Sequence, residues 1–279
     1  MLRQIAITMA AGMLACVSGA ASAQTTLPLW ELGLVVGAGY LPDYPAADEY
    51  STRVLPLPYF VYRGKVFRSE ESGMLRGRVF NSARIEFDVS VAGALDVKSK
   101  DNVARSGMPD LDYMGQIGPR LQIVLGRSPN GDAHVDFELP ARAVLSTDFS
   151  SIEHVGFLSA PELAYQNDNF LGHGDRLKLG VGLTFADSKY QNVIYGVPDA
   201  FATGTRPAYD AKGGYMGAKV SLGVLSPVTS TMRLFGQVRG DYFGGAANEE
   251  SPLFRSKSNG QVLVGAIWSF WQSRTTVVE

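Results

Sequence analysis

Hydrophobic and polar residues alternate with a period of two along many segments of this chain. In residues 134–146 one set of alternate positions is wholly apolar, and the other set carries three charged residues. Residues 84–95, 176–185 and 232–242 repeat the pattern. Because successive side chains of a β-strand point to opposite faces, each segment is predicted to be a strand with one apolar and one polar face.

Two all-β architectures produce such strands. A soluble sandwich or barrel buries the apolar face and uses strands of about 5–6 residues, whereas a transmembrane barrel turns that face to lipid and uses segments of about 10 residues. The segments here run to 11–13 residues, and several carry aromatic residues near their ends, such as Trp30, Tyr40, Trp268 and Phe270. The pattern favours a transmembrane, antiparallel, up-and-down β-barrel, with a periplasmic β-protein as the alternative.

About twelve strands are expected, or ten if the two shortest do not form. Long connections at 96–110, 188–213 and 244–259 follow odd-numbered strands, while even-numbered strands end in tight turns such as 127–131. Outer-membrane barrels place short turns in the periplasm and long loops outside. The predicted strands are 30–40, 52–63, 65–70, 74–80, 83–95, 111–125, 132–146, 155–166, 175–187, 214–225, 231–243 and 260–271.

The first 23 residues are predicted to be a secretory signal peptide. They contain a single charge at Arg3, a short apolar stretch and the small residues Ala21-Ser22-Ala23, which predicts cleavage before Gln24. A lipoprotein acylation site at Cys16 is the alternative. Residues 24–279 would then form one barrel domain, in which 271–279 are a short polar tail reaching into the periplasm.

Removing the signal also removes Cys16, the one cysteine of the chain. The mature chain therefore cannot form a disulfide, a cysteine nucleophile or a thiolate metal site. Loss of Arg3 lowers the net charge by one, from −2 to −3. Such a chain offers no basic patch for nucleic acid.

Fifteen charged residues are predicted to face the lumen, and ten of them are basic. They could line a solute pore, which would then prefer anions, or they could pair with one another and fill the barrel. Twelve strands lie between the barrels that side chains just fill and those that hold a channel, and a filled or narrow lumen is favoured. The residues are Arg76, Arg78, Arg84, Glu86, Asp88, Arg120, Asp136, Glu138, Arg142, Arg176, Lys178, Lys219, Arg233, Arg239 and Asp241.

His154, with Asp148, Ser150 and Ser151 in the preceding loop, suggests a hydrolase at the outer rim. Serine and aspartate are also ordinary turn residues, so a non-enzymatic protein is expected. The acidic segment 43–49 could bind calcium or bridge to lipopolysaccharide, but its spacing fits no calcium loop. No catalytic residue, metal or cofactor is assigned.

Several segments resemble the MipA/OmpV family, whose name refers to the MltA-interacting protein. The most specific is Arg53-Val-Leu-Pro-Leu-Pro-Tyr-Phe-Val-Tyr-Arg-Gly64, preceded by Pro42-Asp43-Tyr44; later landmarks are Gly107-Met-Pro-Asp-Leu111, Tyr195-Gly-Val197, Arg206-Pro-Ala-Tyr-Asp210, Gly213-Gly-Tyr215 and Ser251-Pro-Leu253. The resemblance implies a barrel in the outer membrane of a Gram-negative bacterium, in contact with lipid and lipopolysaccharide.

The resemblance also implies a scaffold that holds a periplasmic lytic transglycosylase near a penicillin-binding protein, while other family members are regarded as porin-like or stress-responsive. The leading expectation is therefore a non-enzymatic scaffold of peptidoglycan-remodelling enzymes. Its partners would touch the short turns 127–131 and 167–174 and the tail. A narrow, anion-preferring channel is the alternative, and an outer-rim hydrolase is a third hypothesis.

Overall fold

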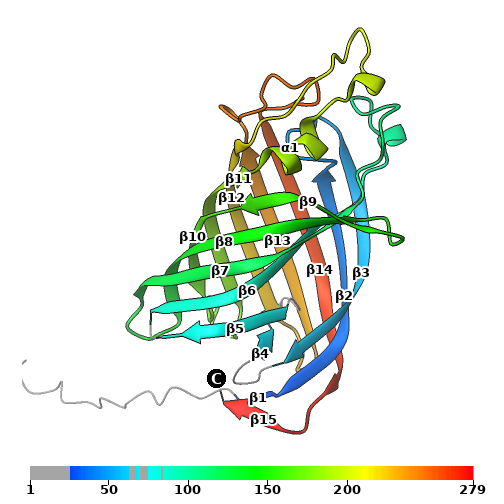
Figure 1. The fold of residues 1–279 in the computed structure, drawn as a ribbon. Coiled ribbons are helices and arrows are strands. Elements are labelled where there is room, and N and C mark those ends of the chain that lie inside the picture. Colours follow the sequence, from blue (N-terminus) through cyan, green and yellow to red (C-terminus); the bar gives the residue numbers. More distant parts are fainter. Residues whose placement is uncertain (1–25, 63–66, 70–74, 83, 279) are drawn as a thin grey trace, which may run out of the picture.

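The computed structural model describes residues 26–62, 67–69, 75–82 and 84–278. Within them the regular structure is mainly antiparallel strand, with short helices in the connections (Figure 1). The strands are β1 (Thr26–Pro28), β2 (Trp30–Pro42), β3 (Tyr50–Tyr62), β4 (Phe67–Ser69), β5 (Leu75–Asn81), β6 (Ile85–Ala94), β7 (Tyr113–Arg127), β8 (Ala133–Thr147), β9 (Ile152–Ser159), β10 (Glu162–Asn167), β11 (Arg176–Ala186), β12 (Gly214–Pro227), β13 (Met232–Tyr242), β14 (Ser258–Gln272) and β15 (Thr276–Val278).

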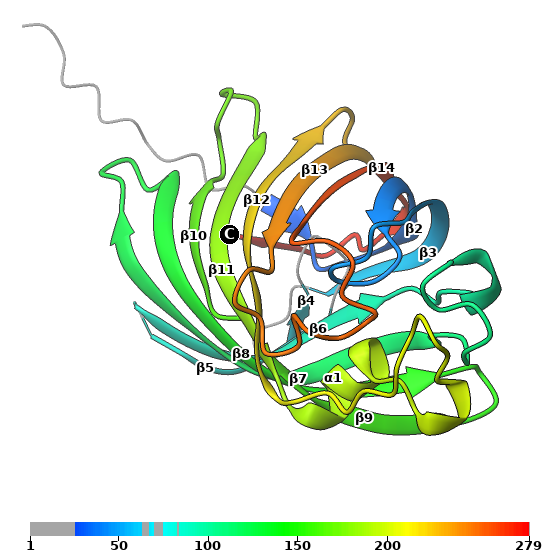
Figure 2. The ribbon, with the colours of Figure 1, turned by 90° about the horizontal axis from the view of Figure 1, so that it is seen from above.

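The strands pair in the order β3-β2-β14-β13-β12-β11-β10-β8-β7-β6-β5-β4. Neighbours in this order are neighbours in the chain, as an up-and-down barrel requires, except where β2 meets β14 and where β10 meets β8, since β9 precedes β10 in the chain. Figure 2, seen from above, shows them arranged round one axis, with β7 and β8 opposite β13 and β14. The predicted antiparallel barrel is confirmed.

The predicted strand 155–166 is interrupted in the structure. β9 pairs with the outer part of β8, and β10 pairs with its inner part, so the two share one position between β8 and β11. The break falls at Ala160 and Pro161, since proline lacks the N–H group that a ladder hydrogen bond needs. With β9 and β10 counted as one, the described residues form a sheet of twelve positions, as predicted.

Long and short connections lie at opposite ends of the barrel (Figure 1). Residues 95–112, 187–213 and 243–257 meet at one end, which we call the outer end, while the turns 128–132 and 228–231 lie at the inner end. Part of the tail predicted at 271–279 is strand in the structure. β14 continues to Gln272, and β15 pairs with β1, because Thr276 to Val278 find an unpaired strand beside them.

The alternation of side chains is plain in β11. Leu179, Val181, Leu183 and Phe185 are exposed, whereas Gly180 and Gly182 between them are buried. Exposed apolar side chains recur in the same way along β2, β3, β7, β12, β13 and β14. An apolar outer surface of this kind is typical of a barrel that faces lipid. No helix in the described part of the chain is long and apolar enough to span a membrane.

Candidate functional site: the lumen and its outer cap

A connected series of opposite charges runs along the inner wall from β6 to β12. We call it the wall ion pairs: Asp88, Arg120, Glu138, Lys178, Glu162 and Lys219. Arg120 joins the first two carboxylates of the series. Its guanidinium donates to both oxygens of Asp88, at 3.1 and 2.6 Å, and to Glu138 Oε2 at 3.0 Å.

The series continues through two lysines. Lys178 Nζ lies 2.8 Å from Glu138 Oε1 and 3.6 Å from Glu162 Oε1, and Lys219 pairs with the other oxygen of Glu162. The carboxylates are buried and each has a cation beside it. Buried charges are tolerated only when they are paired and hydrogen-bonded, so these side chains stabilise one another along the wall.

A buried carboxylate on β8 is held by amide and imidazole groups. Asp136 Oδ2 accepts from Gln122 Nε2 at 2.9 Å, from Gln166 Nε2 at 3.1 Å and lies 3.1 Å from His134 Nε2. The partners come from β7, β10 and β8, so the cluster ties three neighbouring strands together near the inner end.

A second cluster lies on the other side of the lumen, near the inner end. Arg233 Nη2 lies 3.2 Å from Glu31 Oε2 and also bonds the Tyr59 hydroxyl, while Ser269 Oγ donates to Glu31 at 2.7 Å. Tyr59 packs with Val61, Ile267 and partly buried neighbours into a small apolar core. Side chains therefore fill this part of the barrel.

The other predicted lumen residues have different surroundings. Arg239 pairs with Asp241 at 2.6 Å, Arg176 lies 3.4 Å from Asp168, and Arg142 donates to the Ser90 hydroxyl at 2.9 Å. Glu86 is half-buried on β6. Arg84 is exposed in the turn before β6 and does not join the wall ion pairs, and Arg76 and Arg78, on β5, lie outside the residues whose side chains are described.

Two lumen carboxylates were missed by the sequence reasoning. Glu31 is 5% exposed and Glu162 is 9% exposed, and each is the hub of a charged cluster. The sequence did indicate their position. Glu31 and Glu162 each precede a leucine in an alternating segment, so the glutamate lies on the polar face and the leucine on the apolar face. Each lies at the start of its strand, where the alternation is short and easily overlooked.

The long loops pack together at the outer end into what we call the outer cap. It comprises 43–49, 95–112, 187–213 and 243–257, including α1 (Ser188–Tyr195) and the 3₁₀ turns η1 (Ser99–Asp101) and η2 (Asp199–Phe201). Its core contains Tyr44, Leu111, Tyr195, Val197 and Leu253. The long connection 188–213 therefore packs against the other loops.

Buried polar groups join the loops of the outer cap. Arg105 is 3% exposed, and its guanidinium donates to the Ile194 carbonyl at 3.3 Å and to the Pro109 carbonyl at 3.3 Å. Asn248 donates to the Gln191 side chain at 2.5 Å. These bonds connect segments that lie far apart in the sequence, so they hold the loops of the cap together.

Burial in the outer cap changes the ionisation of its side chains. It raises the pKa of Tyr190 to about 12 and raises the pKa of Tyr44 and Tyr195 as well. Burial also lowers the pKa of Arg105. These shifts follow from the removal of water from groups whose charged forms water would stabilise.

Helix α1 begins where the sequence provides an N-cap. Asp187 precedes it, and its side chain accepts a hydrogen bond from Tyr190 N at 2.9 Å. Gly156 of β9 passes directly beneath this turn with a φ of +131°. A side chain at that position would collide with the start of α1.

The acidic segment 43–49 contributes to the outer cap. Asp43 accepts from Ser51 Oγ at 2.5 Å and from Asn102 Nδ2 at 2.9 Å, and Glu49 accepts from Val103 N at 2.7 Å. In the described ranges, no group of three or more His, Cys, Asp and Glu side chains is placed to hold a metal ion.

The residues suggested for a rim hydrolase have other partners in the structure. Asp148 accepts from the backbone and hydroxyl of Ser150 and from Ser151 N, which is an ordinary turn arrangement. The His154 ring packs on Phe157, 4.7 Å between centroids. Among the described residues, no hydrogen bond joins this imidazole to Asp148 or to either serine.

Comparison with solved structures finds membrane barrels of low similarity. An outer membrane channel from Pseudomonas putida F1 is 13% identical, with a TM-score of 0.47 over 90% of this chain and 98% of that one. The NanC porin is 8% identical, with a TM-score of 0.40 over 85% and 100%. Outer membrane phospholipase A from Escherichia coli is 12% identical, with a TM-score of 0.32 over 87% and 93%. Likenesses at this level carry no argument about function.

No curated protein matches the chain. A family model does match it, over residues 34–270, and is described as "MltA-interacting protein MipA". The match covers nearly all of the barrel, and it agrees with the resemblance that segments 42–64, 107–111 and 206–215 carry. The chain belongs to the MipA family, and its fold is that of an outer-membrane β-barrel.

Proposed function

We propose that this protein is a non-enzymatic scaffold that binds a lytic transglycosylase and a penicillin-binding protein at the periplasmic end of an outer-membrane barrel. The observation that supports it most is the state of the lumen. Along the wall from β6 to β12 the charges of the wall ion pairs engage one another, and the outer cap packs over one end. A barrel built in this way acts through its surface rather than through a wide pore.

The family description names an interaction with MltA and supports the choice of partner. The inner turns would face the periplasm, because long loops lie outside in barrels of this class. One of these turns, 168–175, exposes two adjacent apolar side chains, Phe170 at 48% and Leu171 at 60%. Exposed apolar residues in a solvent-facing turn are typical of protein contacts.

A binding assay with purified components tests the proposal. The refolded barrel would be immobilised in non-ionic detergent and offered a purified lytic transglycosylase and a purified penicillin-binding protein. Phe170→Ser/Leu171→Ser should reduce retention of at least one of them. Phe149→Ser is the matched control, since Phe149 is 82% exposed in a loop at the outer end. If the unaltered barrel retains neither enzyme, the scaffold proposal is wrong.

A narrow anion channel is the second candidate. It is favoured by a cavity of about 380 Å³ that lies in the outer half of the lumen and is lined by Arg53, Arg142 and Arg239. Single-channel recording in a planar bilayer distinguishes the two functions. A silent, folded barrel would support the scaffold, whereas a steady anion-selective conductance would favour the channel. His154→Ala should leave lipid and peptide turnover unchanged in either case.

A further inference from the structure

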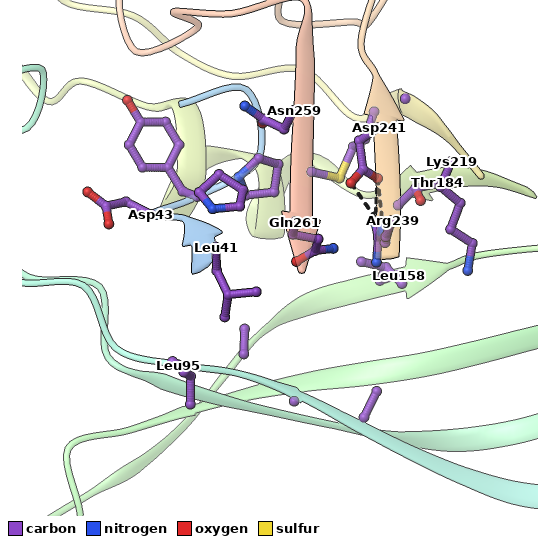
Figure 3. A pocket seen from close by; sticks show the side chains of 18 of the residues that line it. Leu41, Asp43, Leu95, Leu158, Thr184, Lys219, Arg239, Asp241, Asn259 and Gln261 are labelled. Atoms are coloured by element: carbon purple, nitrogen blue, oxygen red, sulfur yellow. Dashed lines mark hydrogen bonds and ion pairs between the residues drawn. The ribbon is translucent and has the colours of Figure 1, made fainter. Parts of the chain in front are cut away.

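The cavity in the outer half of the lumen has one apolar side and one basic side. Figure 3 shows Leu41, Leu95 and Leu158 on its wall, together with Lys219, Arg239 and Asp241. Met216, Phe243 and Tyr190 add to the apolar surface. At about 380 Å³, the cavity falls in the range of roughly 300–1,000 Å³ that is usual for small-molecule sites.

Two of the four cations that line the cavity are neutralised by neighbouring carboxylates. Lys219 pairs with Glu162, and Arg239 pairs with Asp241 at 2.6 Å. Of the other lining carboxylates, Asp43 accepts bonds from Ser51 and Asn102, and Asp96 lies 3.3 Å from Lys98. The acidic groups of the cavity are therefore already engaged.

The remaining two cations are Arg53 from β3 and Arg142 from β8. Arg142 donates from Nε to the Ser90 hydroxyl at 2.9 Å. Within the described part of the chain, neither guanidinium has a carboxylate partner, and the side chain of Arg53 has no hydrogen bond. Each guanidinium carries five N–H donors in a planar fork, which suits carboxylate and phosphate oxygens.

We propose that this cavity binds a small organic anion, whose carboxylate or phosphate group is held by Arg53 and Arg142 and whose apolar body lies against Leu41, Leu158 and Phe243. The site is independent of the proposed scaffold function, because it lies at the opposite end of the barrel from the periplasmic turns. Solvent reaches it, since the Arg239 side chain on its wall remains 35% exposed.

Isothermal titration calorimetry on the refolded mature chain in non-ionic detergent tests the proposal. The probes are benzoate and phenyl phosphate, which share a ring but differ in the anion, with neutral benzamide and inorganic phosphate as comparison ligands. At least one ring anion should bind about tenfold or more tightly than benzamide, because charge-assisted hydrogen bonds require the charge. It should also bind more tightly than inorganic phosphate, which lacks the apolar body.

Arg53→Gln and Arg142→Gln should each weaken binding of that anion by about tenfold or more. Arg84→Gln is the matched control, because it removes the same charge from an exposed turn and should leave affinity unchanged. Heat-modifiable migration in gels checks that each variant is folded. Absence of binding by both ring anions, or equal effects of all three substitutions, would overturn the proposal. Equal affinity for benzamide would overturn it as well.

Discussion

The wall ion pairs are expected to make Arg120 the most costly lumen residue to remove. Its guanidinium bonds both oxygens of Asp88, whose side chain is fully buried, and one oxygen of Glu138, whose side chain is 10% exposed. Arg120→Ala deletes all three bonds. Glu138 keeps Lys178 at 2.8 Å, and Asp88 loses both of its hydrogen bonds from Arg120.

Removing one partner of a buried pair typically costs about 3–5 kcal/mol, because the remaining charge has lost its compensation. We therefore expect Arg120→Ala to lower the free energy of unfolding by about that amount. Arg176→Ala is the matched control. Arg176 lies 3.4 Å from Asp168, and the two side chains are 39% and 46% exposed, so its removal should cost at most about 1 kcal/mol.

Urea unfolding of the refolded barrel in lipid vesicles measures both values. The chain has three tryptophans, and Trp268 and Trp271 are more than half exposed on the lipid-facing surface, so their emission shifts when the barrel leaves the bilayer. Asp88→Asn in the Arg120→Ala background should recover part of the lost stability, since it removes a buried negative charge that has lost both hydrogen bonds from Arg120. The reasoning is refuted if Arg120→Ala costs no more than Arg176→Ala, or if Asp88→Asn lowers stability further.

Three further outcomes are expected. Gly156→Ala should destabilise the outer cap by about 1–3 kcal/mol, because alanine disfavours a φ of +131° and its Cβ would lie 2.6 Å from Tyr190 N; wild-type protease resistance of the loops would contradict this. Arg105→Ala should cost the cap at least about 2 kcal/mol through lost charge-assisted bonds, seen as faster nicking of 95–112, and unchanged nicking would argue against it. Hydrogen bonds, the largest from Ser151 N, lower the pKa of Asp148 to about 2. Because the folded pKa is the lower one, the ionised Asp148 carboxylate stabilises the loop fully at pH values above its unfolded pKa of about 3.9, and this stabilisation is lost as the pH falls through about 2. An NMR titration midpoint near pH 4 would show that these hydrogen bonds do not form.

The strands were predictable because their signal is local. Every long predicted strand overlaps an observed one, and the lumen position of Asp88, Arg120 and Glu138 follows from alternation alone. Pro161 also carried a local signal for the break between β9 and β10, but the apolar residues on both sides favoured one continuous strand.

The outer cap could not be predicted in the same way. Its contacts join Arg105 to Ile194 and Gln191 to Asn248, and no period in the sequence indicates such pairs. The pairing of β15 with β1 has the same origin, since each strand is only three residues long and gains its partner from the other end of the chain. The proposed anion site likewise depends on which arginines lining the cavity have no carboxylate partner among the described residues. Only the three-dimensional arrangement determines this.

The pairing of β2 with β14 has a consequence for the order of folding. It joins residues 30–42 to residues 258–272. β2 can pair with β3 early, but its other edge stays unpaired until β14 is present. Loop-closure entropy makes contacts between such distant segments slow to form. Until the barrel closes, the strand edges stay unpaired and are open to aggregation, and they stay so longest at β2 and β14.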